Sequence, residues 1–171
     1  MIECFAESGA TGIYFGIESG SERILRRLGR SATVEEIREK CTICMEHGIL
    51  PTCSFMIGIP GETIEDVRQT FDLMRSLNTW YVQLHVFTPL PGTPVFENPK
   101  AYGVTIEDSE IPPGVFEARA IHRTEHLPGE MTNELYAEGI GIAELRAREY
   151  ASFLARYPKV DWAMRHIRED E

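Results

Sequence analysis

Residues 12–20 read GIYFGIESG, and residues 52–62 read TCSFMIGIPGE. Each stretch is a nearly continuous apolar run that ends in a glycine turn with a carboxylate, and a helix-like segment follows each turn. Such runs are typical of parallel strands buried on both faces of a sheet. The two stretches therefore predict successive βα units that run in the same direction.

Strands and helices alternate from the start of the chain to residue 103. We expect strands at Gly12–Ile17, Thr52–Ile59 and Trp80–Phe87. Helices are expected at Met1–Ser8, Ser21–Leu28, from Thr33 to the residue before Gly48, and at Thr63–Leu77. Ser21 is the expected cap of its helix, and Thr33 with Glu36 has the spacing of a capping box. The alternation favours right-handed parallel βαβ units, so we predict an α/β fold that is a partial parallel (βα) barrel.

Two of the expected helices each carry one apolar face. The residues of the first face are Val34, Ile37, Cys41, Cys44 and Met45. Those of the second are Ile64, Val67, Phe71 and Met74. Steps of three and four residues are typical of helices packed on a core.

The chain after residue 103 shows no βα pattern. Residues 99–130 hold several prolines and few periodic runs, so we expect mostly loop there. A helix is predicted at Thr132–Tyr157, interrupted at residues 139–141 (GIG) and ended by Pro158. Its expected packing residues are Leu135, Tyr136, Leu145, Tyr150 and Leu154. The predicted domains are thus a partial barrel at 1–103 and a loop and helical C-terminal extension at 104–171.

The composition and charge of the chain narrow the classes of binding partner to expect. The chain has 171 residues and a formal net charge of -10. Acidic chains bind a phosphate backbone poorly, which disfavours nucleic acid as a partner. No apolar window has the length of a membrane helix, and the first ten residues lack the features of a signal peptide, so we expect no membrane association and a cytoplasmic location. The four cysteines are then expected to be thiols or ligands rather than disulfides.

The start of the chain suggests missing strands. Met1–Ser8 has the pattern of the last turns of a helix that ends at Gly9. Three strands are too few to close a barrel, and the first would expose an unpaired apolar edge. Either another chain covers that edge or preceding strands are absent, and we favour the second explanation.

Three turns are expected at one functional rim, because ligands of parallel α/β folds bind beyond the carboxyl ends of the strands. Their sequences are GIESGS, GIPGET and TPLPGTP. Glu18 and Ser19 have groups that can hydrogen-bond hydroxyl or ammonium groups, and the backbone around Gly58–Pro60 can lie against a planar ring. The alternative is that these are only well-formed βα turns.

The motifs GIYFGIESGSERILRRLGR, TVEEIREKCTICMEHGI, SFMIGIPGETIEDVRQTFDLM and VFTPLPGTPVF together resemble the second half of a radical S-adenosylmethionine (radical SAM) core domain. The branch they resemble often carries a cobalamin-binding domain and includes magnesium-protoporphyrin ester cyclase-like proteins. The resemblance covers residues 3 to 103 and implies strands four to six of an incomplete (βα)6 barrel. It also implies the cofactors S-adenosylmethionine and a 4Fe-4S cluster, with cobalamin in the parent protein.

The resemblance implies that reduction of S-adenosylmethionine gives a 5'-deoxyadenosyl radical, which abstracts a hydrogen atom from a small-molecule substrate. The site residues it implies are Glu18 and Ser19 near ribose or methionine, Gly58, Ile59 and Gly61 near adenine, Glu62 as a brace of that turn, and Phe87, Thr88 and Leu90 closing the adenine side. Arg23 or Arg26 is a weaker candidate for the methionine carboxylate. A solvated basic face explains these arginines better.

One departure from the family is decisive for the cluster. Radical SAM enzymes hold it with a Cys-x-x-x-Cys-x-x-Cys loop, and this sequence has no such triplet. Cys41 and Cys44 fall on an apolar helix face, so core packing is favoured over metal binding. Cys4 and Cys53 show no ligand pattern. We therefore expect a chain that needs a missing N-terminal barrel half or a partner chain, and that is inactive alone. The alternative is a non-catalytic βα module that completes a barrel with a partner.

Histidines are secondary candidates. His122 and His126 lie four residues apart, but no further ligand accompanies them, so surface positions are expected. Gln83 and His85 alternate with apolar residues and can point into the barrel as substrate contacts. A hydrogen-bonded core histidine explains His85 equally well.

Overall fold

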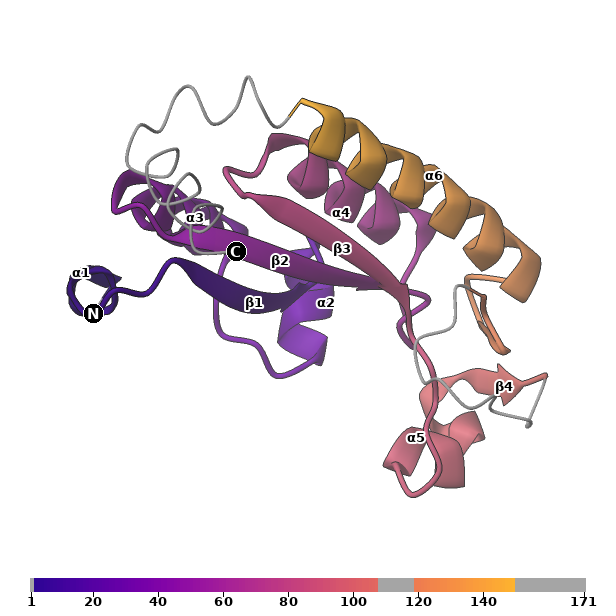
Figure 1. Ribbon diagram of the computed structural model, residues 1–171. Helices are drawn as coiled ribbons and strands as arrows, with labels where there is room; N and C mark the ends of the chain where they lie inside the picture. Colours follow the sequence, from indigo (N-terminus) through magenta and orange to yellow (C-terminus); the bar gives the residue numbers. More distant parts are fainter. Residues whose placement is uncertain (1, 108–118, 150–171) are drawn as a thin grey trace.

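The structure is a computed structural model that describes residues 2–107 and 119–149. Its centre is a parallel sheet with the order β1 (Gly12–Glu18), β2 (Leu50–Ile57) and β3 (Tyr81–Val86), shown in Figure 1. Strands alternate with helices as predicted. The α/β class and the partial parallel barrel arrangement are confirmed.

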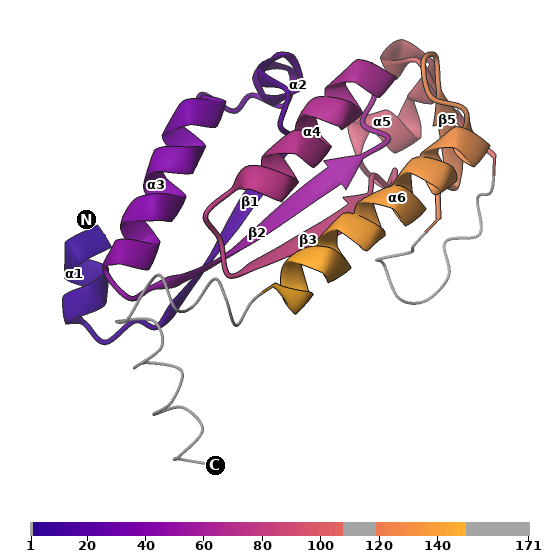
Figure 2. The ribbon, with the colours of Figure 1, turned by 90° about the horizontal axis from the view of Figure 1, so that it is seen from above.

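Helices α3 (Val34–Glu46), α4 (Ile64–Ser76) and α6 (Gly129–Arg148) contribute to one core with the sheet. Helices α4 and α6 run side by side across the strands in Figure 2. Two short helices, α1 (Ile2–Glu7) and α2 (Glu22–Arg27), flank β1 in the chain. No helix of the described residues is long and apolar enough to cross a membrane.

Helix starts follow capping chemistry. Thr33 and Glu36 form the predicted capping box at α3, and Thr63 with Asp66 forms a second one at α4. Ser21 occupies the N-cap position of α2, but its side chain makes no cap hydrogen bond. Its hydroxyl instead donates to Asp66 Oδ1 at 2.6 Å, so the predicted capping role of this side chain is wrong.

The predicted apolar face of α4 is largely correct. Val67, Phe71 and Met74 are fully buried, whereas Ile64 is 42% exposed. Ile64 is the first residue of the helix. In α3, Cys41, Cys44 and Met45 are buried, and Val34 and Ile37 pack at the margin of the core.

Helix α6 differs most from its prediction. It passes through residues 139–141 without interruption, and Gly139 lies where no side chain fits. A Cβ atom on Gly139 would lie 2.2 Å from Leu84 Cδ2 and 2.9 Å from Phe71 Cε1. Leu135 is buried as expected, but Leu145 is 57% exposed. The predictions for Tyr150, Leu154 and Pro158 lie outside the described residues.

Residues 99–130 contain regular structure that the sequence pattern did not reveal. Helix α5 (Pro94–Glu97) leads into the 3-10 helix η1 (Pro99–Tyr102). Strands β4 (Val104–Ile106) and β5 (His122–Thr124) then pair antiparallel. Strands of three residues are too short to show an alternating pattern, which explains the incorrect loop prediction.

Two details of the strands also differ. Strand β2 begins at Leu50 and ends at Ile57, two residues before the predicted ends, because Gly58 turns the chain with a φ of +79°. Strand β1 was expected to be buried on both faces, but Tyr14 is 57% exposed. Among the described residues β1 pairs only with β2, so it is an edge strand.

Candidate functional site

The carboxyl ends of the strands place the predicted turns at one edge of the sheet. Gly16 is in register with Ser54, and Ser54 with Gln83. The register of β1 shifts between Gly16 and Glu18, which is a bulge at the strand's end. Because parallel strands end at the same edge, the turns after β1 and β2 are neighbours, as predicted.

Glu18 ends β1 in a strained conformation. Its φ of +75° makes it the one non-glycine residue with positive φ in the described part of the chain. The side chain folds back over the strand, since a Cβ atom on Gly16 would lie 2.7 Å from Glu18 Oε1. Arg30 Nη2 donates to the same oxygen at 3.1 Å. The carboxylate is therefore held at the rim with one cation beside it.

Ser19 and Gly20 fix the first turn to α4. Ser19 is fully buried; its Oγ lies 3.1 Å from Thr70 Oγ1 and accepts from the Ser21 amide at 3.1 Å. The Gly20 amide donates to Thr70 Oγ1 at 2.9 Å. A Cβ atom on Gly20 would lie 2.4 Å from Gln69 O. The hydroxyl of Ser19 thus faces the helix.

Glu62 braces the second turn from inside, as expected. The amides of Gly58 and Ile59 donate to Glu62 Oε2 at 2.7 Å and 3.2 Å. The side chain is fully buried, and its other oxygen, Oε1, has no partner among the described residues. Burial raises the pKa of Glu62 to about 8 although both amide hydrogen bonds lower it. Burial therefore favours the neutral acid over the carboxylate, and the two amide hydrogen bonds act in the opposite direction.

Asp66 joins the two turns. Arg23 pairs with it, and Arg23 Nη2 also donates to Gly61 O at 2.8 Å. Burial alone would raise the pKa of Asp66, but hydrogen bonds from Arg23, Ser21 and Thr63 hold it well below its usual range. The Arg23 side chain is 51% exposed, as expected for a solvated basic face, but it also supports the turn. Arg26 pairs with Glu22 at 3.3 Å on the surface.

A histidine that was expected at the surface is part of the site. His122 on β5 is only 1% exposed, and its Nε2 lies 2.9 Å from Gly58 O. Its ring meets the edge of Phe87 at a centroid distance of 5.5 Å and an interplanar angle of 77°. Sequence reasoning missed this contact because β5 has only three residues and gives no periodic signal. His126 is exposed, as predicted.

The third turn closes this side of the sheet through backbone contacts. The Phe87 amide donates to Ile57 O at 2.8 Å. Thr88 Oγ1 donates to Val86 O at 3.3 Å, and Leu90 O accepts from the Thr93 hydroxyl at 2.7 Å. The structure thus brings Phe87 beside the Gly58 turn, while Thr88 and Leu90 shape the loop that follows.

The sheet face opposite the helices carries polar groups. Tyr14 OH donates to Gln83 Oε1 at 2.9 Å across the sheet. Gln83 and His85 alternate with the buried Val82, Leu84 and Val86, so they lie on this face. This is the face on which they would point into a barrel, and their contact with a substrate stays a prediction.

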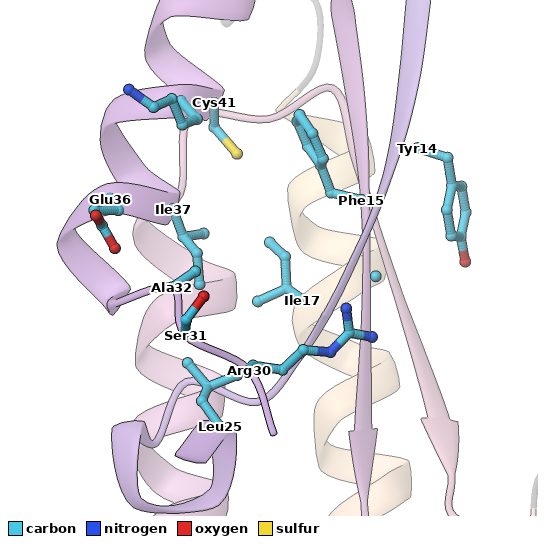
Figure 3. Close-up of a pocket in the computed structure, with 12 residues that line it drawn as sticks. Tyr14, Phe15, Ile17, Leu25, Arg30, Ser31, Ala32, Glu36, Ile37 and Cys41 are labelled. Atoms are coloured by element: carbon cyan, nitrogen blue, oxygen red, sulfur yellow. The ribbon is translucent and has the colours of Figure 1, made fainter. Parts of the chain in front are cut away.

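A hollow of about 680 Å³ lies beside the edge strand β1. Figure 3 shows Phe15, Ile17 and Cys41 projecting into the space between β1 and α3, while Tyr14 points to the other side of the strand. The guanidinium of Arg30 lies at its margin. This apolar hollow is where the sheet stops among the described residues.

The cysteines do not form a metal site in the described part of the chain. Cys41, Cys44 and Cys53 are buried, and Cys41 Sγ lies 3.7 Å from Cys53 Sγ. The interaction with Cys53 and burial both raise the pKa of Cys41. No group of three His, Cys, Asp or Glu residues within 2–107 and 119–149 could hold a metal ion.

Two curated proteins are similar in sequence to part of this chain. An uncharacterized methyltransferase, PH0819, of Pyrococcus horikoshii is 37% identical over 97 residues, covering 57% of this chain and 21% of that protein. The tRNA-2-methylthio-N(6)-dimethylallyladenosine synthase of Paracoccus denitrificans is 32% identical over 97 residues, covering 56% of this chain and 22% of that protein. The chain spans about a fifth of the length of these curated relatives.

Two solved structures share the fold. The radical S-adenosylmethionine methyltransferase TsrM of Kitasatospora setae, with cobalamin and a [4Fe-4S] cluster bound, matches 82% of this chain and 33% of its own at a TM-score of 0.59 and 20% identity. Elp3 of Methanocaldococcus infernus matches 58% of this chain and 24% of its own at a TM-score of 0.50 and 23% identity. The sequence model of the Radical SAM superfamily matches residues 1–74 of this chain.

Proposed function

We propose that this chain supplies the adenosine-facing part of the cofactor site of a radical SAM enzyme, and that the ligands of the 4Fe-4S cluster come from outside it. The observation that carries the proposal is the internally braced turn Gly58–Glu62, which lies inside the family match at residues 1–74. The neighbouring turn at Glu18 lies at the same sheet edge. The turns that follow the three parallel strands therefore form one rim.

The residues of the rim suit S-adenosylmethionine but not the cluster. Gly58 and Gly61 have positive φ values of +79° and +82°, so their backbone turns without a side chain toward a planar ring. The orphaned Glu62 Oε1 marks a polar position behind that turn. By contrast, the described residues hold no thiol triplet. When S-adenosylmethionine is bound beside a reduced cluster, it would supply one chemical step, the removal of a hydrogen atom from the substrate.

Each rim residue has a proposed role in holding the cofactor. The Glu18 carboxylate accepts hydrogen bonds from ribose hydroxyls or the methionine ammonium. Gly58, Ile59 and Gly61 present backbone to the adenine, and Glu62 keeps this backbone in place. The side chains and loop of Phe87, Thr88 and Leu90 exclude water from the adenine side. Ser19 acts on the cofactor only through the position it gives Glu18, because its hydroxyl binds Thr70.

The substrate is proposed to be a small molecule that contacts the polar sheet face at Tyr14 and Gln83. The Paracoccus relative is named for a tRNA modification, but the net charge of -10 argues against a nucleic acid surface here. We further propose a cobalamin-binding domain in the parent protein, on the branch resemblance. A cytoplasmic location stays a prediction.

A second candidate is a non-catalytic βα module that completes a barrel with a partner chain. The hollow beside β1 favours it, because a further strand and helix would fill this space and pair the strand's edge. Under this proposal the cluster ligands lie on the partner. Under the first, they lie on a continuous polypeptide with this chain.

Anaerobic reconstitution with iron and sulfide tests the main proposal. The chain alone should show no stoichiometric thiolate-to-iron absorbance. Joined to the segment that carries the cluster ligands, it should bind S-adenosylmethionine in equilibrium dialysis, with an affinity that Glu18→Ala lowers about tenfold. Cys41→Ala, a change in the core, should leave the affinity within about twofold. A stoichiometric cluster on the chain alone, or equal losses for the two variants, would contradict the proposal.

A further inference from the structure

We infer that His122 is a positioning residue of the Gly58–Glu62 turn and ties the C-terminal part of the chain to the cofactor rim. The purpose that this inference gives the turn rests on the proposed function, whereas the geometry of the turn does not. His122 lies outside the family match, which ends at residue 74. Its imidazole nevertheless contacts the carbonyl of Gly58, the first residue of the matched turn.

The Gly58–Ile59 peptide is held on both sides. The Ile59 amide donates to Glu62 Oε2 at 3.2 Å, and the Gly58 carbonyl lies 2.9 Å from His122 Nε2. A carbonyl oxygen only accepts, so Nε2 must carry the proton and the neutral ring must be the Nε2–H tautomer. The side chains of Glu62 and His122, which are far apart in the sequence, thus fix the orientation of this one peptide plane.

The surroundings leave this histidine little freedom. Its ring packs against the edge of Phe87, and a Cβ atom on Gly58 would lie 3.1 Å from Thr132 Cγ2 and 3.6 Å from His122 Cε1. His122 Nδ1 has no hydrogen-bond partner among the described residues. A buried imidazole with one unpaired nitrogen is costly in free energy, so its retained bond to Gly58 is the compensating contact.

The strand β5 delivers the histidine to this place. Pairing of Ile106 with His122 fixes its register, and the Thr132 methyl from the first turn of α6 covers the same glycine. The hairpin β4–β5 and the start of α6 therefore act as a back support for the turn. A change in the C-terminal part is transmitted to the rim through this one peptide.

Three variants of the full chain separate this role from packing. His122→Leu removes the donor and keeps an apolar side chain. His122→Gln places an amide N–H near the position of Nε2. His126→Leu changes the exposed histidine four residues later and is the matched control. Amide hydrogen exchange by NMR is the readout, with the buried Phe71 amide of α4 as an internal reference for global opening.

His122→Leu should speed exchange of the Gly58 and Ile59 amides about tenfold while Phe71 is unchanged. His122→Gln should restore both amides to within about threefold of the wild type, and His126→Leu should have no effect. In the completed enzyme, the affinity for S-adenosylmethionine should follow the same order. Unchanged turn amides in folded His122→Leu would overturn the inference.

The wild-type ring gives a test that needs no variant. Nitrogen-15 shifts of His122 should show a protonated Nε2 and an unprotonated Nδ1 at neutral pH, and the opposite tautomer would overturn the inference even if His122→Leu does not fold. Failure of the wild type to bind S-adenosylmethionine in the completed enzyme would instead refute the proposed function. The tautomer and exchange results would then still decide the role of His122.

Discussion

The turns after β1 and β2 have similar sequences but use their carboxylates in opposite ways. Glu62 is fully buried, hydrogen-bonds its own turn and leaves one oxygen unpaired among the described residues. Glu18 keeps its side chain at the rim, 17% exposed, beside Arg30. The first turn is instead held by Ser19 and Gly20 against α4.

This difference distinguishes a carboxyl group that supports its own turn from one that can contact a ligand. A carboxyl group that satisfies its own turn has no free acceptor at the surface, so Glu62 is suited to shape the backbone. The carboxylate of Glu18, in a strained residue at the strand's end, accepts from Arg30 and not from its own turn, so Glu18 is suited to meet a ligand. Each prediction below would break or sharpen this contrast, starting from the largest expected effect.

The largest effect should come from the ionisation of Glu62. Its pKa is about 8 in the folded chain and 4.5 in the unfolded chain, so the folded state binds more protons between these values. The unfolding free energy should therefore fall as pH rises from 4.5 to 8, by an amount on the order of 4 kcal/mol for this group. Below pH 4.5 its stabilisation is fully present.

Glu62→Gln isolates this contribution. The glutamine oxygen accepts the two amides, and its NH2 group stands where the protonated Oε1 lies, so the variant mimics the neutral acid. Chemical denaturation at several pH values should show a variant that gains stability over the wild type as pH rises. Glu18→Gln is the matched control. A difference that stays constant from pH 5 to 8 would mean that Glu62 is ionised when folded.

The architecture could be predicted from the sequence because the patterns that indicate its strands and helices are local and repeated. Continuous apolar runs identified all three strands of the sheet, and the Thr33–Glu36 spacing located the start of α3. The family resemblance implied Glu62 as a brace, and in the structure its Oε2 accepts from the Gly58 amide. These features depend on neighbours within a few residues, which a pattern can show.

What the sequence did not reveal depends on contacts between distant residues. The hydrogen bond from His122 to Gly58 joins positions 64 residues apart, and no pattern near His122 in the sequence predicts it. Gly139 resembles a helix breaker until the side chain of Leu84 occupies the missing Cβ position. Cys53 approaches Cys41 only once β2 and α3 pack together. In each case tertiary packing overrode local propensity.

Glycine substitutions should show that the first turn is held by close approach and the second by backbone conformation. In Gly20→Ala the new methyl meets the backbone of α4 at 2.4 Å, which cannot yield, so a loss of about 3 kcal/mol is expected. In Gly61→Ala it meets the movable Arg27 guanidinium at 3.0 Å, and the φ of +82° costs about 1–2 kcal/mol. Denaturant unfolding measures both. A larger loss for Gly61→Ala would reverse this part of the contrast.

Glu18→Gly should have the smallest effect on stability and the most specific effect on binding. Glycine relieves the positive φ of +75° but adds freedom to the unfolded chain, so the unfolding free energy should change by less than about 1 kcal/mol. Affinity for S-adenosylmethionine in the completed enzyme should nevertheless fall about tenfold, because the carboxylate is gone. Arg30→Gln, which removes only the ion pair at 3.1 Å, is the control. If Glu18→Gly destabilised the fold by several kcal/mol, the strain at Glu18 would belong to the turn's structure, and the distinction between a supporting and a contacting carboxylate would fail.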